Sequence, residues 1–399
     1  MNFDTFNLSP DIMAGVRGVG YTTPTPIQLQ SIPPIMKGND VIGLAQTGTG
    51  KTAAFVLPIL HRLQKSPRGR VGALIISPTR ELAEQTCETV DELGRRTGLR
   101  SIAIYGGVGM DQQIQRLRRG VEIAVACPGR LLDHVWRGTI NLSEVEVLVI
   151  DEADRMFDMG FLPDIRNILK CLTKPKQTLL FSATMPKDIR LLVQDVLQHP
   201  VTVQIGLTAP AATVSHALYP VKQHLKTGLL LELLYQIDTE SVLVFTRTKY
   251  RAERVSQQLR AAGFKATSLQ SNLSQPRRRA ALDGFRNGSF KILVATDIAA
   301  RGIDVLGISH VINYDMPESI DAYTHRIGRT GRVDQTGDAL TMVTSADAAM
   351  VRDIERALNT KLEYRTLQGF DYSTAAPSVE NVRPPRRLPA RRVRSSAAV

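Results

Sequence analysis

Short apolar runs rich in β-branched residues alternate along this chain with longer stretches in which apolar residues recur at helical spacing. This alternation is typical of parallel sheets that are covered by helices. A chain of 399 residues is also too long for one core of ordinary size, so we expect two α/β domains. The predicted strands are Val41–Leu44, Ala73–Ser77, Ile123–Ala126, Val145–Ile150, Thr178–Phe181, Val242–Phe245, Lys291–Ala295, His310–Asn313 and Ala339–Val343, with Arg80–Leu93 as a clear helix between two of them.

A change in composition marks the predicted boundaries. Small and polar residues between the halves predict a linker over 207–215, which separates a first domain, 1–206, from a second, 216–372. From 373 to 399, prolines are interleaved with arginines. Such a segment cannot bury a core, so we expect a disordered basic tail.

Charge and cysteine content narrow the class of protein. The chain has 50 Lys and Arg against 38 Asp and Glu, a formal net charge of +12, which favours a polyanionic partner. Its 3 cysteines are too few and too widely spaced for a disulfide framework or a metal-ligand set, which indicates a reducing compartment. The chain shows no signal-peptide pattern and no long apolar run, so we expect a soluble, cytoplasmic protein without membrane association.

The strongest local motif lies between the predicted strand Val41–Leu44 and a helical run, Ala53–Leu63. Its glycines allow the backbone to approach a phosphate, and backbone N–H groups point inward at the start of the helix. In such a loop the lysine reaches the β- and γ-phosphates of ATP, and the hydroxyl that follows it ligates Mg²⁺. The alternative is a glycine-rich turn that binds nothing. The residues are Ala45, Gln46, Thr47, Gly48, Thr49, Gly50, Lys51 and Thr52.

Two carboxylates end the apolar run that reaches Ile150. In parallel sheets, ligands bind at the carboxyl ends of the strands. We expect Asp151 to hold the Mg²⁺ shell and Glu152 to orient the attacking water. Without the phosphate loop, the same pattern would indicate only a solvated strand end.

The segment Asp151-Glu152-Ala153-Asp154 resembles the motif that names the DEAD-box RNA helicases. From Phe3 to about Asp371 the chain is similar to that family, with its motifs in the family's order. The resemblance is greatest to bacterial RhlE-type members, which combine a compact two-lobe core with a basic extension. It implies two tandem RecA-like domains, ATP and Mg²⁺ as ligands, and RNA-stimulated ATP hydrolysis.

The resemblance also implies an adenine-reading motif at 20–28. Gln28 would hydrogen-bond the adenine edge, Tyr21 would stack on the base, and Phe3 would support the motif. Without the phosphate loop, the same residues would indicate a proline-rich helix start with a core tyrosine.

In the first lobe the resemblance assigns Arg80, Gly107 and Arg130 to the RNA backbone. Cys127 stands where the family usually has Thr, which puts one hydroxyl contact to RNA in doubt. Asp154, Ser182 and Thr184 would couple the state of ATP to RNA binding. The hydroxyls of Ser182 and Thr184 would equally suit helix capping before Pro186.

In the second lobe the resemblance assigns Arg247 and Thr296 to RNA and Asp304 to the ribose of ATP. Gln270-Ser271 departs from the usual His-Gly of the family, which puts one RNA-side loop in doubt.

The segment His325–Arg332 resembles the arginine-finger motif. Arg329 and Arg332 would face the γ-phosphate, and His325 would link Glu152 to the second lobe. A plain basic helix face is the alternative. Because the fingers and the phosphate loop lie in different lobes, hydrolysis would require closure.

Three functions fit these motifs to different degrees. The favoured one is an ATP-dependent RNA helicase with a monomeric core, acting in ribosome assembly, RNA turnover or cold adaptation and meeting factors of those processes. An ATP-gated RNA clamp is the alternative, which the presence of Glu152, Arg329 and Arg332 disfavours. A DNA-translocating helicase is disfavoured by Gln28 and by the Asp-Glu-Ala-Asp sequence. A tandem α/β protein without nucleotide chemistry is the remaining possibility.

Overall fold

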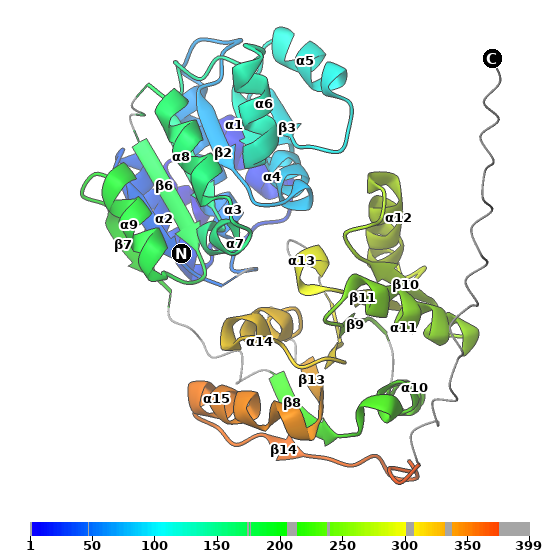
Figure 1. Cartoon of the computed structure of the whole chain (residues 1–399). Coiled ribbons are helices and arrows are strands. Elements are labelled where there is room, and N and C mark those ends of the chain that lie inside the picture. The colour runs from blue at the N-terminus through cyan, green and yellow to red at the C-terminus, as the bar shows by residue number, and fades with distance from the viewer. Residues whose placement is uncertain are drawn as a thin grey trace, which may run out of the picture.

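The computed structural model describes residues 2–46, 48–173, 175, 177–205, 214–237, 240–300, 307–331 and 337–374. The described residues form two lobes, each built on a seven-stranded sheet in which all paired strands run parallel (Figure 1). The fold class expected from the sequence, two tandem parallel-sheet domains, is therefore confirmed.

The first sheet has the strand order β3-β4-β2-β5-β6-β1-β7. Its strands are β1 (Val41–Leu44), β2 (Ala73–Ile76), β3 (Ser101–Ile104), β4 (Ile123–Ala126), β5 (Val147–Asp151), β6 (Gln177–Ser182) and β7 (Val201–Gln204). The helices of this lobe are η1 (Phe3–Phe6), α1 (Pro10–Gly18), α2 (Pro26–Met36), α3 (Lys51–Leu63), α4 (Arg80–Leu93), α5 (Met110–Arg118), α6 (Pro128–Trp136), α7 (Ala153–Asp158), α8 (Leu162–Cys171) and α9 (Lys187–Val196).

The second sheet repeats the same topology, with the order β10-β11-β9-β12-β13-β8-β14. Each strand of this sheet occupies the place of the strand numbered seven lower in the first sheet. The strands are β8 (Val214–Pro220), β9 (Val242–Phe245), β10 (Ala266–Leu269), β11 (Ile292–Ala295), β12 (His310–Asn313), β13 (Gly337–Val343) and β14 (Glu363–Tyr364). The helices are η3 (Gln223–Leu225), α10 (Lys226–Gln236), α11 (Lys249–Ala261), α12 (Gln275–Arg286), α13 (Asp297–Ala300), α14 (Ile320–Ile327), η4 (Ser345–Asp347) and α15 (Ala348–Leu358).

The inner strands of both sheets are buried on their two faces, so β2, β4, β9 and β11 are apolar without interruption. In β2, Ala73 and Ile75 pack into one core cluster, whereas Leu74 and Ile76 pack into the cluster on the other face. Strand β9 divides in the same way between the two faces of its sheet. Successive side chains of a strand point to opposite faces, so each sheet separates two layers of helices.

The strand bounds show where the sequence was informative. Strands β1, β4, β9 and β12 and helix α4 have the predicted bounds, and β2, β5, β6, β11 and β13 differ from the prediction by one or two residues at an end. Strands β3, β7, β8, β10 and β14 were not predicted. Val214 and Ser215, expected in the linker, are the first residues of β8, and 206–213 lie outside the described residues.

The predicted tail falls almost entirely outside the described residues, which end at Thr374. Ser373 and Thr374 donate hydroxyl hydrogen bonds of 2.5 and 2.9 Å to the carboxylate of Asp371. Within the described ranges, no helix has the length and apolar character needed to cross a membrane.

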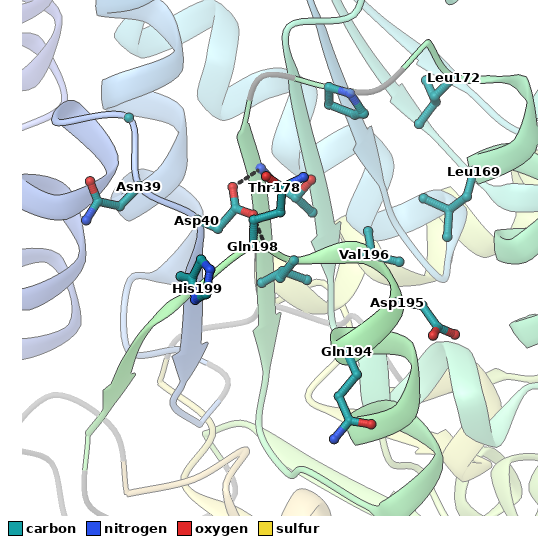
Figure 2. Close-up of a pocket in the computed structure, with 13 residues that line it drawn as sticks. Asn39, Asp40, Leu169, Leu172, Thr178, Gln194, Asp195, Val196, Gln198 and His199 are labelled. Carbon is teal, nitrogen blue, oxygen red and sulfur yellow. Dashed lines mark hydrogen bonds between the residues drawn. The ribbon is translucent and has the colours of Figure 1, made fainter.

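A cavity of about 900 Å³ lies at the amino-terminal edge of the first sheet (Figure 2). Its floor is organised by Asp40, whose carboxylate accepts from the backbone N–H of Thr178 at 2.7 Å and of Gln198 at 2.6 Å. The carboxylate thus joins the starts of β1, β6 and β7. None of the site residues predicted from the sequence lines this cavity.

Close packing between β1 and β6 predicts that adding one methyl group at Gly43 lowers stability. A Cβ atom on Gly43 of β1 would lie 2.4 Å from two ring atoms of Phe181 on β6. We expect Gly43→Ala to lower the free energy of unfolding by about 1–3 kcal/mol through overpacking. Gly18→Ala is the control, because a Cβ there meets nothing within 4 Å. Thermal unfolding of the two variants measures the difference, and equal melting temperatures would contradict the predicted clash.

Candidate functional site

The predicted site residues gather at the carboxyl edges of the two sheets. In the first sheet, the segments after β3, β4 and β2 carry the residues assigned to RNA, whereas those after β5 and β1 carry residues assigned to ATP, and β6 leads into Ser182 and Thr184, which were assigned to coupling. Because β2 and β5 are neighbours, the two sets adjoin along one edge. The equivalent strands β10, β11 and β9 of the second sheet precede Gln270, Thr296 and Arg247.

The loop after β1 has the backbone form that a phosphate cradle requires. Gly48 and Gly50 have φ values of 85° and 90°, in the region that favours glycine. A Cβ on Gly50 would lie 2.6 Å from the Gln28 amide nitrogen, so glycine is also needed there for space. Lys51 is buried at the start of α3, and its Nζ donates to the carbonyl of Ala45 at 2.7 Å. Thr47 lies outside the described residues.

Gln28 joins the predicted adenine-reading motif to this loop. Its Oε1 accepts from the backbone N–H of Thr25 at 2.9 Å, and its Nε2 donates to the carbonyl of Gly50 at 3.1 Å. An amide has a second N–H and a second lone pair, so one donor and one acceptor remain for a ligand. Tyr21 is 41% exposed and stacks on buried Phe3, with ring centroids 6.1 Å apart.

Asp151 and Glu152 lie buried at the end of β5. Among the described residues, Asp151 Oδ1 has no hydrogen-bond partner. Burial, together with the neighbouring Glu152 carboxylate, raises the pKa of Asp151 above its usual range. A divalent cation beside Asp151 would offset both effects, because it stabilises the ionised carboxylate, so the site fits Mg²⁺. No cluster of three potential metal ligands occurs in the part of the chain that the structure describes.

Glu152 is held in a strained conformation by a residue that sequence reasoning missed. Its φ of 52° is in the left-handed region, which is uncommon for a non-glycine residue and concentrates at functional sites. The carboxylate pairs with Arg155 from the first turn of α7, and Arg155 is only 2% exposed. The Arg155 guanidinium therefore fixes Glu152 at the carboxyl edge.

Asp154 is the hydrogen-bond acceptor for the segment after β6. Its Oδ2 accepts from the backbone N–H of Ala183 at 3.2 Å and of Thr184 at 3.0 Å, and from the Thr184 hydroxyl at 3.2 Å. The Ser182 hydroxyl accepts from the Asp154 N–H at 3.2 Å. The Ser182 and Thr184 side chains thus bind Asp154, whereas Pro186 occupies the N-cap of α9. Neither hydroxyl is therefore the N-cap of α9.

Electrostatics connect the same carboxylate to the second lobe. Burial alone would raise the pKa of Asp154, but Lys51, His325 and the hydrogen bond from Thr184 lower it. Burial, then Arg155, lower the pKa of His325, whereas Asp154 raises it. His325 and Arg155 line one small cavity with Arg329, which is buried. His325 and Arg329 on one lobe therefore face Asp154, Glu152 and Arg155 on the other. Arg332 and Asp304 lie outside the described residues.

The RNA-side residues of the first lobe also converge. A Cβ on Gly107, whose φ is 81°, would lie 2.2 Å from the Arg80 guanidinium, so glycine leaves the space that Arg80 occupies. Arg130 Nη1 donates to the carbonyl of Val108 at 3.2 Å. Segments after three adjacent strands thus place Arg80, Gly107 and Arg130 together.

The second lobe contacts this cluster directly. Arg278 pairs with Glu81 at 2.8 Å, with side chains 12% and 10% exposed, and Arg80 Nη1 donates to Gln275 Oε1 at 3.2 Å. Both second-lobe residues come from the first turn of α12. Sequence reasoning missed Glu81, Gln275 and Arg278, since nothing local relates positions nearly 200 residues apart.

Comparisons with known proteins agree with this geometry. The DEAD/DEAH box helicase model matches residues 25–192, and the helicase conserved C-terminal domain model matches residues 225–334. The chain is 41% identical to the DEAD-box ATP-dependent RNA helicase CshA of Bacillus subtilis over 91% of this chain and 74% of that protein.

This chain belongs to the DEAD/DEAH box helicase family.

Two further relatives support the assignment. RhpA, a DEAD-box ATP-dependent RNA helicase of Helicobacter pylori, is 38% identical over 91% of this helicase and 73% of its own length. The structure of S. cerevisiae Dbp5 bound to RNA and ADP BeF3 superimposes with a TM-score of 0.83 at 29% identity, over 92% of this chain and 95% of that one. The RecA-like description of both lobes is thereby confirmed.

The two departures from the family pattern have local explanations in this helicase. Cys127 follows β4 and is half-buried, and burial raises the pKa of its thiol to about 12, so it is not a reactive thiolate. Gln270 Oε1 accepts from the N–H of Asn272 at 2.6 Å, so its side chain closes the turn in which it lies. Arg278 Nη1 donates to the Gln270 carbonyl at 3.3 Å, which ties this turn to the contact between the lobes.

The environment of Asp151 predicts opposite effects on stability and activity. A carboxyl whose pKa is raised by folding is disfavoured as an anion in the folded state, so its charge lowers stability at neutral pH. We expect Asp151→Asn to raise the melting temperature of the nucleotide-free helicase while abolishing ATP hydrolysis. Asp188→Asn, at an exposed position of α9, is the control and should change neither. A lower melting temperature in Asp151→Asn would contradict the prediction that the ionised Asp151 carboxylate destabilises the folded helicase.

Proposed function

We propose that this helicase couples RNA-stimulated hydrolysis of ATP to the local separation or remodelling of RNA duplexes. The observation that carries the proposal is the position of the Asp154 carboxylate. It binds the segment Ser182–Thr184 and lies in the fields of Lys51, at the phosphate loop, and His325, on the other lobe. One buried group therefore responds to the nucleotide site and to the distance between the lobes.

On the nucleotide side, we assign the loop 45–52 to the phosphates, with Lys51 at the β- and γ-phosphates. Asp151 and Thr52 would hold Mg²⁺, which supplies charge neutralisation of the phosphate oxygens when bound. Glu152, fixed by Arg155, would orient the attacking water. Tyr21 offers an exposed face for stacking on the base, and Gln28 offers its remaining donor and acceptor to the adenine edge. Asp304 would bind the ribose.

On the RNA side, we assign Arg80, Gly107 and Arg130 of the first lobe and Arg247 and Thr296 of the second to the sugar-phosphate backbone. Guanidinium groups and N–H-rich glycine turns suit phosphates, and contacts of this kind carry little sequence information. We therefore expect weak sequence preference.

Arg329 and Arg332 are our proposed fingers, and His325 is the proposed link between Glu152 and the second lobe. The burial of Arg329 beside Arg155 and His325 supports this arrangement. Because these groups come from α14 and the segment after it, the catalytic set is complete only when the lobes are closed. RNA that bridges both lobes would favour that state.

Several finer assignments belong to the same proposal. The Arg- and Pro-rich composition of 373–399 supports an RhlE-type member, and the free cysteines support a cytoplasmic location. We further propose the domain bounds 1–206 and 216–372, a monomeric core, and a role in ribosome assembly, RNA turnover or cold adaptation.

Two substitutions separate ATP binding from ATP hydrolysis. Lys51→Ala should abolish ATP binding, because it removes the buried ammonium of the phosphate loop. Glu152→Gln should keep ATP and RNA bound but lower the turnover by about 10²–10⁴-fold, as loss of a positioned acid–base group does. Nucleotide titration and steady-state phosphate release measure both, with Lys37→Ala at an exposed position as the control. Near wild-type turnover in Glu152→Gln would overturn the assignment of the water-positioning residue.

The nucleotide preference tests the role of Gln28. Gln28→Ala should reduce the preference for ATP over GTP by up to about tenfold, since a hydrogen bond contributes about 0.5–1.5 kcal/mol. Tyr21→Ala is the matched control, because stacking does not distinguish the bases, and it should weaken both nucleotides alike. The measurement is the ratio of the two dissociation constants. An unchanged ratio in Gln28→Ala would show that Gln28 does not read the adenine base.

A further inference from the structure

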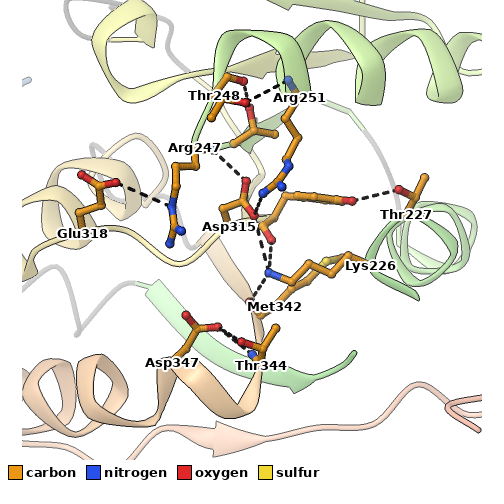
Figure 3. Close-up of polar contacts among 12 residues, drawn as sticks. Lys226, Thr227, Arg247, Thr248, Arg251, Asp315, Glu318, Met342, Thr344 and Asp347 are labelled. Atoms are coloured by element: carbon orange, nitrogen blue, oxygen red, sulfur yellow. Dashed lines mark hydrogen bonds and ion pairs between the residues drawn. The ribbon is translucent and has the colours of Figure 1, made fainter. Parts of the chain in front are cut away.

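A buried cluster of charges lies at the carboxyl edge of the second sheet, around Asp315 (Figure 3). The Asp315 carboxylate pairs with Arg251 at 2.6 Å and lies 3.8 Å from the ammonium of Lys226. Lys226 is only 2% exposed, and its Nζ also donates to the carbonyls of Tyr314 at 2.8 Å and Met342 at 3.5 Å. None of these residues was assigned a role from the sequence.

The cluster is the second-lobe counterpart of the nucleotide site. Lys226 begins the helix that follows β8, as Lys51 begins the helix that follows β1, and β8 and β1 hold equivalent places in the two sheets. Ile150 pairs with the last residue of β2, and Asn313 pairs with the last residue of β9, so Asp315 stands at the register position of Glu152. A lysine and a carboxylate are thus placed alike in both lobes.

The two lysines differ in what surrounds them. Lys51 follows a glycine-rich loop that leaves room for phosphates, whereas Lys226 follows Val221–Leu225, a stretch without glycine. The Lys226 ammonium is held by two carbonyls and by Asp315. Protein groups therefore take the place around Lys226 that phosphates would take around Lys51. The cluster also connects the ends of β12 and β13 to α10.

Asp315 touches both functional sides of its lobe. On the RNA side, its Oδ2 accepts from the backbone N–H of Arg247 at 2.9 Å. Figure 3 shows the Arg251 side chain reaching Asp315, whereas the Arg247 guanidinium points to Glu318. On the ATP side, its carbonyl accepts from Arg326 Nη1 at 2.7 Å. Arg326 belongs to α14, which carries His325 and ends just before Arg329.

Arg326 extends the connection to the segment that begins with Thr296. Its guanidinium makes two hydrogen bonds to the Asp297 carboxylate, of 2.6 and 2.7 Å, and a third, of 3.0 Å, to Asn313. It also lies 5.0 Å from the ring centroid of Phe245, the last residue of β9. Arg326 is 2% exposed, so these contacts are shielded from solvent.

Buried, multiply bonded charges resist rearrangement, because separating one partner leaves an uncompensated charge in a low-dielectric interior. The backbone of Arg247, the start of α13 and the helix α14 are therefore joined by one chain of hydrogen bonds through Asp315 and Arg326. Any shift of Arg247 on binding a phosphate is transmitted through Asp315 and Arg326 to the helix that carries His325.

We propose that Asp315 is a positioning residue that fixes the RNA-binding Arg247 relative to the finger helix α14, so that the ATP dependence of RNA affinity passes through this carboxylate. The inference rests on the proposed roles of Arg247 and Arg329. The cluster around Asp315 and Lys226 would thus serve coupling between ATP and RNA, and it would bind no ligand itself.

The test is the ratio of RNA affinities in two nucleotide states. A fluorescent oligouridine is titrated into the full-length helicase with a non-hydrolysable ATP analogue and, separately, with ADP. Asp315→Asn alone would leave Lys226 buried without its counter-charge, so the main variant is the double substitution Asp315→Asn with Lys226→Met. Arg251→Gln, at a partly exposed position, removes one arm of the cluster without burying an unpaired charge.

We expect the affinity ratio to fall by about fivefold or more in the double variant, which is the lower range of typical coupling factors, and by less in Arg251→Gln. The KM for ATP should stay within about twofold, because Lys51, Thr52 and Gln28 all lie in the other lobe. Asp353→Asn is the matched control, since Asp353 forms an exposed ion pair with Arg356 in the same lobe. It should leave the ratio unchanged.

Thermal unfolding separates coupling from a purely structural role. A folded double variant with a lower melting temperature and the wild-type affinity ratio would overturn the proposal. Arg247→Ala, measured in parallel, tests the function on which it rests. Undiminished RNA binding in Arg247→Ala would refute the assignment of Arg247, whereas weakened binding there with an unchanged ratio in the double variant would refute only the role of Asp315.

Discussion

The parallel direction of every paired strand is the constraint on which the site depends. Parallel strands bring all their carboxyl ends to one edge, so segments far apart in sequence meet there. The sheet order then divides that edge, with β3, β4 and β2 on the RNA side and β5, β6 and β1 on the ATP side. Since β2 and β5 are adjacent, the two sides are one strand spacing apart, and a single buried side chain can touch both.

The two lobes use the same topology with different charge balance. In the first lobe, Asp151 Oδ1 and Arg155 Nη2 have no hydrogen-bond partner among the described residues. In the second, the Asp315 carboxylate is bonded by Arg251 and by the Arg247 N–H, and Lys226 by two carbonyls. An under-satisfied buried group is costly and favours a ligand that completes it, whereas a satisfied cluster favours rigidity. The duplicated topology thus supports a binding site in one lobe and a scaffold in the other.

Sequence reasoning succeeded where local pattern and chemistry coincide. The loop 45–52 and the acidic end of β5 follow apolar strands, and both lie where that pattern indicates. The strand Ser101–Ile104 has too short an apolar run to stand out, and Glu363–Tyr364 is only 2 residues long and exposed. The partners of Arg80 and Asp315 could not be predicted, because they depend on how helices pack and on contacts between lobes. Arg155 lies only three residues from Glu152, so its spacing was a local signal that sequence reasoning overlooked. The hydrogen bonds that join Asp154 to Ser182 and Thr184 could not be predicted either, because they depend on the pairing of β5 with β6.

The two contacts between α12 and the first lobe differ in how readily RNA can replace them. Arg80 donates to the neutral amide of Gln275, and a phosphate is a stronger acceptor for a guanidinium than an amide is. That bond can therefore exchange for RNA at little cost. The pair of Arg278 with Glu81 is largely buried and joins two full charges, so breaking it would leave an unpaired charge behind. An approaching RNA strand would thus release Gln275 from Arg80 while the ion pair keeps α12 in place. Under the proposed role of Arg80 in RNA binding, this ion pair would keep the two lobes joined at α12.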